Sequence, residues 1–508
     1  MSNKTRLAVN LEKIAAYVNW LIPVFCLFSL MASFFLSSLF YIVFAVFFIA
    51  FAFNVYFLFL QKNSVLLSNF GIIALFRYFA ESVGPELRQY FFSSDTEERP
   101  FNRTERSEIY RKAKGVDSSS AFGSQYENYG STFKLRHSMF PTAITEHEKF
   151  SLYFGEERKI KNIFSIQKPL IVSAMSFGAL GQRAVQALTR GAKKAGVAVN
   201  TGEGGFPKYH HEQGADLIFQ IGTAKFGVRD ENGNFSPEKL KKICELPSVK
   251  MIELKLSQGA KPGKGGLLPK EKITAEIAEL RGVEMGKDIV SPAFHPECDS
   301  AEGIVRFTKE LQEISGLPVG IKLCFGRKQE FAYLVHVMKE SGDFPDFIAV
   351  DGGEGGTGAA PKSFMDDVGM PLFHSLPWID KCLRDAGVRN KTKIIAAGKL
   401  INAGKHFLAL SLGADACYSA RGFLLALGCI QSLTCNANNC PVGITTHDLK
   451  LQSGFDVESR SERIVKYMHS LEHEYEELMA SMGIRNLQEL CLDNVYFPSE
   501  EDRYKALG

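Results

Sequence analysis

The chain has 508 residues, and its 59 lysines and arginines nearly balance 56 aspartates and glutamates, for a formal net charge of +3. This balance, without a run of basic residues interleaved with aromatics, argues against a nucleic-acid partner. Ten cysteines and no cleavable signal peptide predict a reducing compartment, in which thiols serve as ligands or core residues.

The N-terminal region has no charged residue from Ile14 to Leu60. As a single helix this stretch would measure about 70 Å, against a hydrocarbon core of roughly 30 Å. We therefore predict two transmembrane helices with a turn near Ser37, forming a membrane anchor of residues 1–64. Because basic residues flank both ends of this hairpin, we expect both ends, and the chain that follows, on the cytoplasmic side of the cytoplasmic membrane.

Residues 65–135 are predicted to connect the anchor to the remainder of the chain. The segment is polar and charged around "SSDTEERPFNRTERSEIYRKAKG". An amphipathic helix is expected to begin near Asn102.

From about residue 165 onward, short apolar runs alternate with stretches of helical period. The runs are "LIVSAM", "VAVNTG", "MIELKLSQ", "DIVSP", "VGIKLC", "FIAVDGG", "KIIAAG" and "ACYSA". Strands alternating with helices predict a parallel sheet, and eight such units predict an α/β fold of the (β/α)₈ TIM-barrel type, assigned to residues 136–485 with a tail of 486–508. An open doubly wound sheet is the alternative, but no GxGxxG opens a helix after the first strand.

The carboxyl ends of barrel strands form the active site in this fold. Residues expected there are Met175, Glu203, Lys255, Gln258, Ser291, Lys322, Asp351 and Gly398. Lys255 and Lys322 lie within apolar strands, where an ammonium is costly without a partner. Two late loops, "AAGKLINAGK" and "SARGFLLALG", are suited to a phosphate, and "VDGGEGGTGAAP" allows a flat ligand to approach the main chain. Each glycine cluster alone is more often a turn, but three in register favour a binding site.

Three cysteines, Cys429, Cys435 and Cys440, lie within twelve positions in "GCIQSLTCNANNCPVG". Their spacing does not fit a zinc site, which requires closer pairs. Together with "SAMSFGALG", "NTGEGG", "KLSQGAKPGKGG" and "DGGEGGTGAAP", in this order, the motif resembles the FMN-binding synthase domain of glutamate synthase. The resemblance covers roughly Ser165 to Arg485. The apolar N-terminus and "GPELRQYFFSSDTEERPF" resemble the single-chain, membrane-associated bacterial members of the family.

The resemblance implies two cofactors, FMN and a 3Fe–4S cluster. In glutamate synthases the cluster is held by three cysteines with the spacing of Cys429, Cys435 and Cys440. By the same resemblance, Glu203 and Lys255 are expected to be catalytic, and Gln258, Lys261 and Arg281 to bind 2-oxoglutarate. The residues that match flavin-contacting motifs are Met175, Ser176, Lys322, Gly353, Thr357, Gly398 and Gly422.

The expected reaction is the reductive amination of 2-oxoglutarate to glutamate. No glutaminase, nicotinamide or ferredoxin-type segment is recognised, so ammonia and electrons are expected from outside, the latter from a ferredoxin or a reductase subunit. Lys264 and Leu267 depart from the family pattern, in which a carboxylate and an amide stand at these positions. This departure keeps open an FMN oxidoreductase for another 2-oxo or amino acid. A non-catalytic electron-transfer subunit at the membrane is a further alternative.

Overall fold

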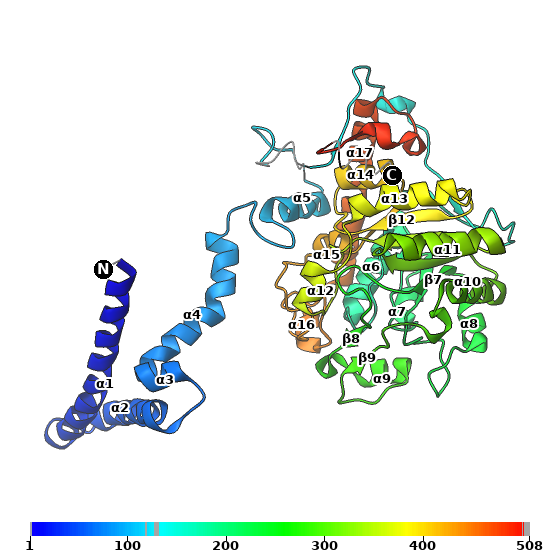
Figure 1. Cartoon of the computed structure of the whole chain (residues 1–508). Coiled ribbons are helices and arrows are strands. Elements are labelled where there is room, and N and C mark those ends of the chain that lie inside the picture. Colours follow the sequence, from blue (N-terminus) through cyan, green and yellow to red (C-terminus); the bar gives the residue numbers. More distant parts are fainter. Residues whose placement is uncertain (1–2, 117–118, 126–131, 500, 502–508) are drawn as a thin grey trace. The chain divides into compact units, whose positions relative to one another are not determined.

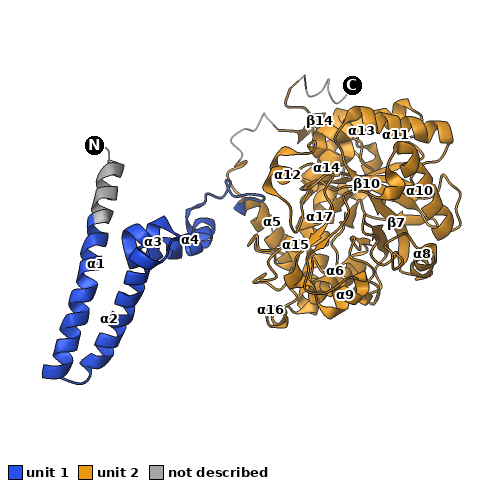
Figure 2. Ribbon diagram, turned by 60° about the horizontal axis from the view of Figure 1, so that its bottom comes forward, with its two compact units in different colours: residues 1–103 blue, residues 104–508 orange. Residues whose placement is uncertain are grey.

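The computed structural model describes residues 3–116, 119–125, 132–499 and 501 (Figure 1). Their contacts divide the chain into two compact units, residues 1–103 and residues 104–508 (Figure 2). The finer division into anchor, connector, barrel and tail remains a prediction.

The first unit begins with two long apolar helices, α1 (Asn3–Phe35) and α2 (Phe40–Val55), joined by a short turn. They match the predicted helix pair. The helical segments α3 (Val65–Phe70) and α4 (Ala74–Leu87) follow. By length and composition three stretches could cross a membrane, namely Lys13–Phe35, Phe40–Leu60 and Val65–Phe92. The third was not expected from the sequence, because it contains four charged residues.

A buried asparagine explains why the third apolar stretch is broken between α3 and α4. Asn54 on α2 is 3% exposed, and its Oδ1 accepts a hydrogen bond of 2.8 Å from the backbone N–H of Ile72. The preceding residue, Gly71, has φ +59°, and a Cβ atom there would lie 2.2 Å from the same oxygen. Only glycine therefore permits this close approach.

The second unit is built around a closed barrel of eight parallel strands, which confirms the predicted fold (Figure 1). Around the barrel the strands follow the order β10-β11-β12-β13-β4-β5-β6-β7. Their bounds are β4 Leu170–Val172, β5 Val199–Asn200, β6 Leu217–Ile221, β7 Val249–Lys255, β10 Val319–Cys324, β11 Phe347–Asp351, β12 Lys393–Ala397 and β13 Ala416–Ser419.

Two of the strand assignments made from the sequence need correction. The barrel strand β6, "LIFQI", was missed, and "DIVSP" was wrongly counted in its place. The latter contains β9 (Ile289–Val290), which pairs antiparallel with β8 (Leu267–Leu268) outside the barrel. A short apolar run looks the same in a barrel strand and in a hairpin, because only the pairing partner distinguishes them.

Helices cover the outside of the barrel. The longer ones in the second unit are α6 Gln182–Ala195, α8 Pro237–Cys244, α10 Ala301–Ser315, α11 Lys328–Ser341, α13 Leu372–Asp385, α14 Ala403–Ser411 and α17 Val457–Met482. Shorter ones are α7 Lys208–His211, α9 Ala275–Arg281, α12 Lys362–Asp367, α15 Arg421–Leu427 and α16 Leu449–Ser453. The helix expected near Asn102 is α5 (Arg103–Lys114), which confirms that prediction.

A small hairpin packs against the amino ends of the barrel strands. It is formed by β2 (Leu152–Phe154) and β3 (Phe164–Ile166). Phe154 packs edge-on against Phe347, the first residue of β11, with the ring centroids 5.7 Å apart. A second short pair, β1 (Lys134–Leu135) with β14 (Val495–Tyr496), joins the two ends of this unit. With apolar side chains filling the amino end, a functional site is left to the carboxyl end.

Candidate active site

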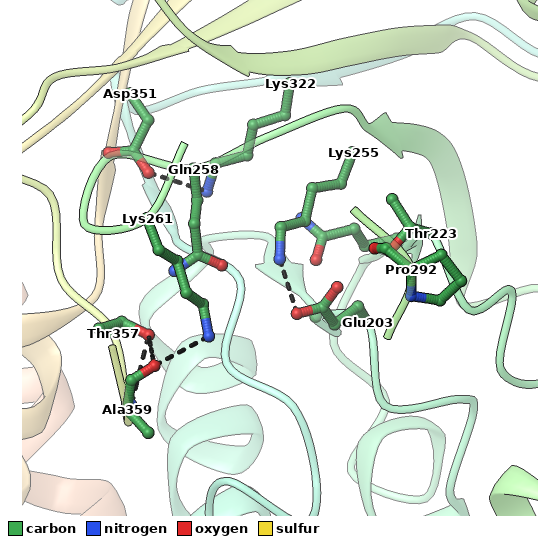
Figure 3. A network of polar contacts seen from close by, with 12 residues as sticks. Glu203, Thr223, Lys255, Gln258, Lys261, Pro292, Lys322, Asp351, Thr357 and Ala359 are labelled. Atoms are coloured by element: carbon green, nitrogen blue, oxygen red, sulfur yellow. Dashed lines mark hydrogen bonds and ion pairs between the residues drawn. The ribbon is translucent and has the colours of Figure 1, made fainter. Parts of the chain in front are cut away.

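An ion pair between Glu203 and Lys255 lies at the carboxyl end of the barrel (Figure 3). Lys255 is the last residue of β7, and its Nζ donates to Oε1 of Glu203, on the loop after β5, at 2.6 Å. Burial raises the pKa of the Glu203 carboxyl, but the nearby charges of Lys255 and Lys261 outweigh this effect and hold the pKa below its usual value. Glu203 is therefore ionised, and it can accept a proton or a hydrogen bond from an N–H group.

The main chain closes around the Glu203 carboxylate on two sides. A Cβ atom on Gly222 would lie 2.5 Å from Oε2, and one on Gly266 would lie 2.9 Å from Oε1. A larger residue at either position would displace the carboxylate. Both glycines therefore help to fix its position opposite Lys255.

A buried histidine, His295, supports Lys255 from behind. It is 1% exposed, and its Nε2 donates to the backbone carbonyl of Lys255 at 3.0 Å. Burial lowers the pKa of His295 to about 4, so the ring is neutral at physiological pH. The motif "SPAFHPE" carried no recognisable signal for this role, because the contact joins residues forty positions apart.

Lys322 lies on β10 directly opposite Lys255 in the register of the two parallel strands. Like charges in such a pair repel each other unless each has its own counter-charge. Lys255 has Glu203, whereas Nζ of Lys322 lies 3.7 Å from Oδ2 of Asp351 and 5.8 Å from the centre of the Tyr418 ring. Both lysines are buried, 9% and 5% exposed, so each needs the counter-charge that the structure gives it.

The loop after β7 packs directly on the glycine-rich loop after β11 (Figure 3). The N–H of Gly259 donates to Oδ2 of Asp351 at 3.1 Å. A Cβ atom on Gly259 would lie 1.9 Å from the carbonyl oxygen of Gly352, so no other residue fits. The side chain of Gln258 donates to Gly356 O at 3.3 Å, and that of Lys261 donates to Ala359 O on the same loop.

The ammonium of Lys261 is buried, 5% exposed, and Nζ donates to Ala359 O at 2.9 Å. The hydroxyl of Thr357 donates to the same carbonyl at 3.2 Å. Burial and the charge of Lys255 lower the pKa of Lys261 to about 8. An anionic ligand would restore the charged form, so this lysine is suited to bind a carboxylate.

Arg281, the last residue of α9, reaches the same site. Its side chain is 6% exposed, its Nη2 donates to Phe177 O at 2.9 Å, and its guanidinium carbon lies 5.0 Å from the centre of the Phe226 ring. Burial lowers the pKa of Arg281 to about 10, opposed by the charge of Glu203. Cβ atoms on Gly178 and Gly204 would lie 2.6 and 2.9 Å from Nη2. The glycines of "SFGALG" and "GEGG" thus make room for this cation.

Most residues that match flavin motifs lie on loops at the carboxyl end of the barrel, whereas Lys322 lies on β10 and Gly422 in α15. A Cβ atom on Gly202 would lie 2.6 Å from the N atom of Ser176, so the loop containing Met175 and Ser176 touches the loop before Glu203. Gly398, with φ +137°, follows β12 and is close to Gly352 N. The remaining members of this set are Gly353, which packs on Gly369, and Gly422 at the start of α15.

A fully buried carboxylate, Glu253, was not anticipated. It lies in the barrel interior with 0% exposure and accepts hydrogen bonds from Asn200 at 2.8 Å, from Gln220 at 2.6 Å and from Tyr418 at 2.8 Å. Such a satisfied network holds Tyr418 rigidly beneath Lys322.

The three cysteines lie on the loop after α15 and are close enough to influence one another electrostatically. Burial raises the pKa of Cys429 to about 11 and raises that of Cys435. Burial acts in the same direction on Cys440, but N–H groups from Thr445 and its neighbours donate to the sulfur and hold the pKa of Cys440 below its usual value. All three thiols are free of disulfides.

The cysteine loop is held by residues from distant parts of the chain. The hydroxyl of Tyr110 on α5 donates to Cys429 O at 2.6 Å. The ammonium of Lys272 donates to Cys435 O at 3.2 Å. Within the loop, Gln431, Leu433 and Asn438 have φ values of 56° to 58°, a region that non-glycine residues rarely occupy. Such strain persists only where surrounding contacts impose it, and it concentrates at functional sites.

Among the residues that the structure describes, no group of three His, Cys, Asp or Glu side chains is arranged to hold a single metal ion. N–H groups donate to the Cys440 sulfur, and the buried ammonium of Lys272 lies near the Cys435 and Cys440 thiols. This donor chemistry, soft sulfurs in a locally positive setting, fits an anionic iron–sulfur cluster. The glycine-lined loops and the buried Lys322 similarly fit a flat cofactor with a negatively charged ring.

The structure brings Lys255, Lys261 and Arg281 within electrostatic range of Glu203. Sequence reasoning missed the supporting residues His295, Glu253, Tyr418, Lys272 and Tyr110. For Glu253 the sequence did carry a signal, a charged residue within the apolar run "MIELK". That signal does not identify a partner.

Comparison with known proteins gives a consistent result. Residues 108–485 match the family model described as a conserved region in glutamate synthase. The glutamate synthase large subunit-like protein YerD of Bacillus subtilis (strain 168) is 38% identical over 479 residues, 87% of this chain and 91% of that protein. The archaeal glutamate synthase [NADPH] of Archaeoglobus fulgidus is 35% identical over 325 residues, and the match spans 64% of this chain and 61% of that protein. Among solved structures, a flavocytochrome b2 mutant with sulfite bound aligns with a TM-score of 0.46 and 15% identity, over 85% of this chain and 88% of that one.

Proposed function

Because the chain belongs to the glutamate synthase family, we propose that it is an FMN- and iron–sulfur-dependent oxidoreductase acting on CH–NH₂ donors, which converts 2-oxoglutarate to glutamate. The observation that carries this proposal is the Glu203–Lys255 ion pair with Lys261 and Arg281 in electrostatic range. A site with several cations and one carboxylate suits a dianionic 2-oxo acid and an ammonia molecule.

The cofactors would be held by separate sets of residues. We assign FMN to the loops of Met175, Ser176, Gly353, Thr357, Gly398 and Gly422, and the 3Fe–4S cluster to Cys429, Cys435 and Cys440. When bound, FMN would supply a hydride and the cluster single electrons, so that 2-oxoglutarate, ammonium, two electrons and two protons yield glutamate and water. Lys322 would face the flavin ring and favour its negative charge on reduction.

The substrate would be oriented by cations at its carboxylates. Arg281 has further N–H groups beyond the one bonded to Phe177 O, and it can bind a carboxylate in a bidentate manner. Lys261 and Gln258 would contact the second carboxylate from the opposite loop. The buried setting strengthens these contacts, because water screens them less than at the surface.

Proton transfer would fall to the ion pair. Glu203 is ionised and can accept a proton from the ammonium ion or from the adduct with the 2-oxo carbon. Lys255 can donate a hydrogen bond to the departing carbonyl oxygen and stabilise the charge that develops there. His295 would hold the Lys255 backbone in place as a neutral donor.

A second substrate is favoured by one observation. Lys264, where the family pattern has a carboxylate, contributes a repulsive charge to Lys261 and lies 5.8 Å from the ring of Phe364. A site with this additional cation would also accept another 2-oxo acid of high negative charge. The same assay with a series of 2-oxo acids distinguishes the two candidates.

The decisive experiment follows the flavin of the purified protein after chemical reduction under anaerobic conditions. Addition of 2-oxoglutarate with ammonium should reoxidise the flavin and form one glutamate per flavin, and omission of either compound should prevent this. Reoxidation by another 2-oxo acid alone would favour the second candidate. A flavin that no 2-oxo acid reoxidises would favour a non-catalytic electron-transfer subunit.

Two matched arginine variants test the substrate assignment. Arg229 and Arg281 both lie over the Phe226 ring, at 4.9 and 5.0 Å, but only Arg281 is buried at the proposed site. Arg281→Lys should weaken 2-oxoglutarate binding by about 2 kcal/mol as the bidentate contact is lost. Arg229 donates to the Arg281 carbonyl at 2.6 Å, so Arg229→Lys should weaken binding by less than Arg281→Lys. Equal effects of the two changes would contradict the assignment.

The remaining partners are also proposals. We infer that the apolar helices of the first unit attach the enzyme to the cytoplasmic membrane with the barrel on the cytoplasmic side. Ammonia and electrons would come from separate proteins, the electrons from a ferredoxin or a reductase subunit.

A further inference from the structure

Lys272 is an unusual residue, because its ammonium is buried without a carboxylate. It lies in the single helical turn Lys270–Lys272 and is 2% exposed. Among the described residues it forms no ion pair with Asp or Glu. Its Nζ donates to two backbone carbonyls, Ala179 O at 2.6 Å and Cys435 O at 3.2 Å.

The groups nearest to this ammonium that could carry negative charge are the thiols of the cysteine loop. Cys435 and Cys440 attract it, whereas the neighbouring cation Arg281 repels it. A buried charge without a counter-ion costs several kcal/mol, so a position of this kind persists only where negative charge compensates it. Neutral thiols would not provide that charge, but thiolates bound to iron would.

The contact of Lys272 with Ala179 O lies on the loop assigned to the flavin. Three consecutive carbonyls of that loop accept side-chain hydrogen bonds. Phe177 O accepts from Arg281 at 2.9 Å, Gly178 O from His447 Nε2 at 2.9 Å and Ala179 O from Lys272 at 2.6 Å. Lys272 therefore bridges the cysteine loop and the proposed flavin loop. Its two hydrogen bonds fix the position of its ammonium between them.

We propose that Lys272 is a positioning residue whose ammonium neutralises the iron–sulfur cluster and raises its reduction potential. A cluster held by three thiolates is anionic and gains a further negative charge on reduction. A fixed cation nearby stabilises the reduced form more than the oxidised form. This inference rests on the proposed cluster and goes beyond it, because it assigns a role to a residue that binds neither iron nor substrate.

The test compares two glutamine variants of the full-length protein. Lys272→Gln removes the charge but keeps an N–H donor for the two carbonyls. Lys270→Gln removes the same charge from an exposed position two residues away. The midpoint potentials of cluster and flavin are measured by anaerobic redox titration, with electron paramagnetic resonance for the cluster and visible absorbance for the flavin. Iron and sulfide are determined on each preparation.

Lys272→Gln should lower the cluster potential by at least 59 mV, a tenfold change in a one-electron equilibrium. The flavin potential should move less, and Lys270→Gln should leave both values unchanged. Loss of iron from Lys272→Gln alone, with FMN retained, would indicate a structural role for Lys272 and would overturn the proposed effect on the potential. Unchanged cluster potentials, or equal shifts in both variants, would overturn the proposal. A parent protein that contains FMN but no iron would overturn it together with the proposed cluster, which separates this failure from that of Lys272 alone.

Discussion

Replacement of Gly259 by alanine tests how the substrate loop is positioned. In the structure a Cβ atom at this position would lie 1.9 Å from Gly352 O and 3.0 Å from the Cα and N atoms of Gly355. All three are backbone atoms, so no flexible side chain can move aside. Since a carbon–oxygen contact requires about 3.3 Å, the two loops must separate by about 1.4 Å.

The separation would break the contacts that hold the substrate-binding side chains. Gln258–Gly356 O is already 3.3 Å and Lys261–Ala359 O is 2.9 Å, so neither hydrogen bond survives a shift of that size. Overpacking of this kind destabilises a protein by about 1–3 kcal/mol. Misplacement of binding groups by about 1 Å can reduce the rate about 100-fold. We therefore expect kcat/KM for the 2-oxo acid to fall by about two orders of magnitude, with FMN still bound.

The matched control is Gly358→Ala on the facing loop. A Cβ atom on Gly358 would meet no neighbouring atom within 4 Å, and this residue has no positive φ, so alanine should be tolerated there. Both variants are assayed for 2-oxo-acid-dependent flavin reoxidation and for the temperature of thermal unfolding. If Gly259→Ala gives the same activity and unfolding temperature as Gly358→Ala, the two loops do not approach each other as closely as the structure has them.

Three further predictions concern charge, the cysteines and the membrane. Because the pKa of Lys261 is about 8, its cation is lost as the pH rises through that value, so 2-oxoglutarate should bind more weakly at pH 9 than at pH 7. Lys261→Met should bind 2-oxoglutarate weakly and with the same affinity at both pH values. If the affinity of Lys261→Met falls with pH as in the parent protein, another group titrates. Cys435→Ser should abolish the resonance signal of the oxidised cluster but retain FMN, whereas a persistent signal would exclude Cys435 as a ligand. Deletion of residues 1–64 should release the chain from the membrane fraction, and release only after deletion of residues 1–103 would identify Val65–Phe92 as a third span.

Local patterns in the sequence predicted much of the architecture. The charge-free run from Ile14 to Leu60 and the amphipathic segment after Asn102 became helices, because length, hydropathy and period are properties of a continuous segment. The alternation of apolar runs with helical stretches predicted the parallel barrel for the same reason. Once the barrel is known, the carboxyl ends of its strands are adjacent, and lysines at those ends can be expected in one site.

The sequence predicted the number of barrel strands correctly but assigned one of the eight to the wrong segment. "LIFQI" and "DIVSP" are both short and apolar, yet only the first pairs within the barrel. Pairing is decided by contact with a partner elsewhere in the chain. No property of either segment alone contains that information.

The tertiary structure alone decided which residues complete the site. Glu203 lies 52 positions from Lys255, Cys435 lies 163 positions from Lys272, and Tyr110 lies 319 positions from Cys429. The sequence by itself determined the residue types, their spacing along each loop and the family they resemble. Counter-charges, shifted pKa values and the close approach of Gly259 to Gly352 arise from distance in space, which folding sets and linear order does not.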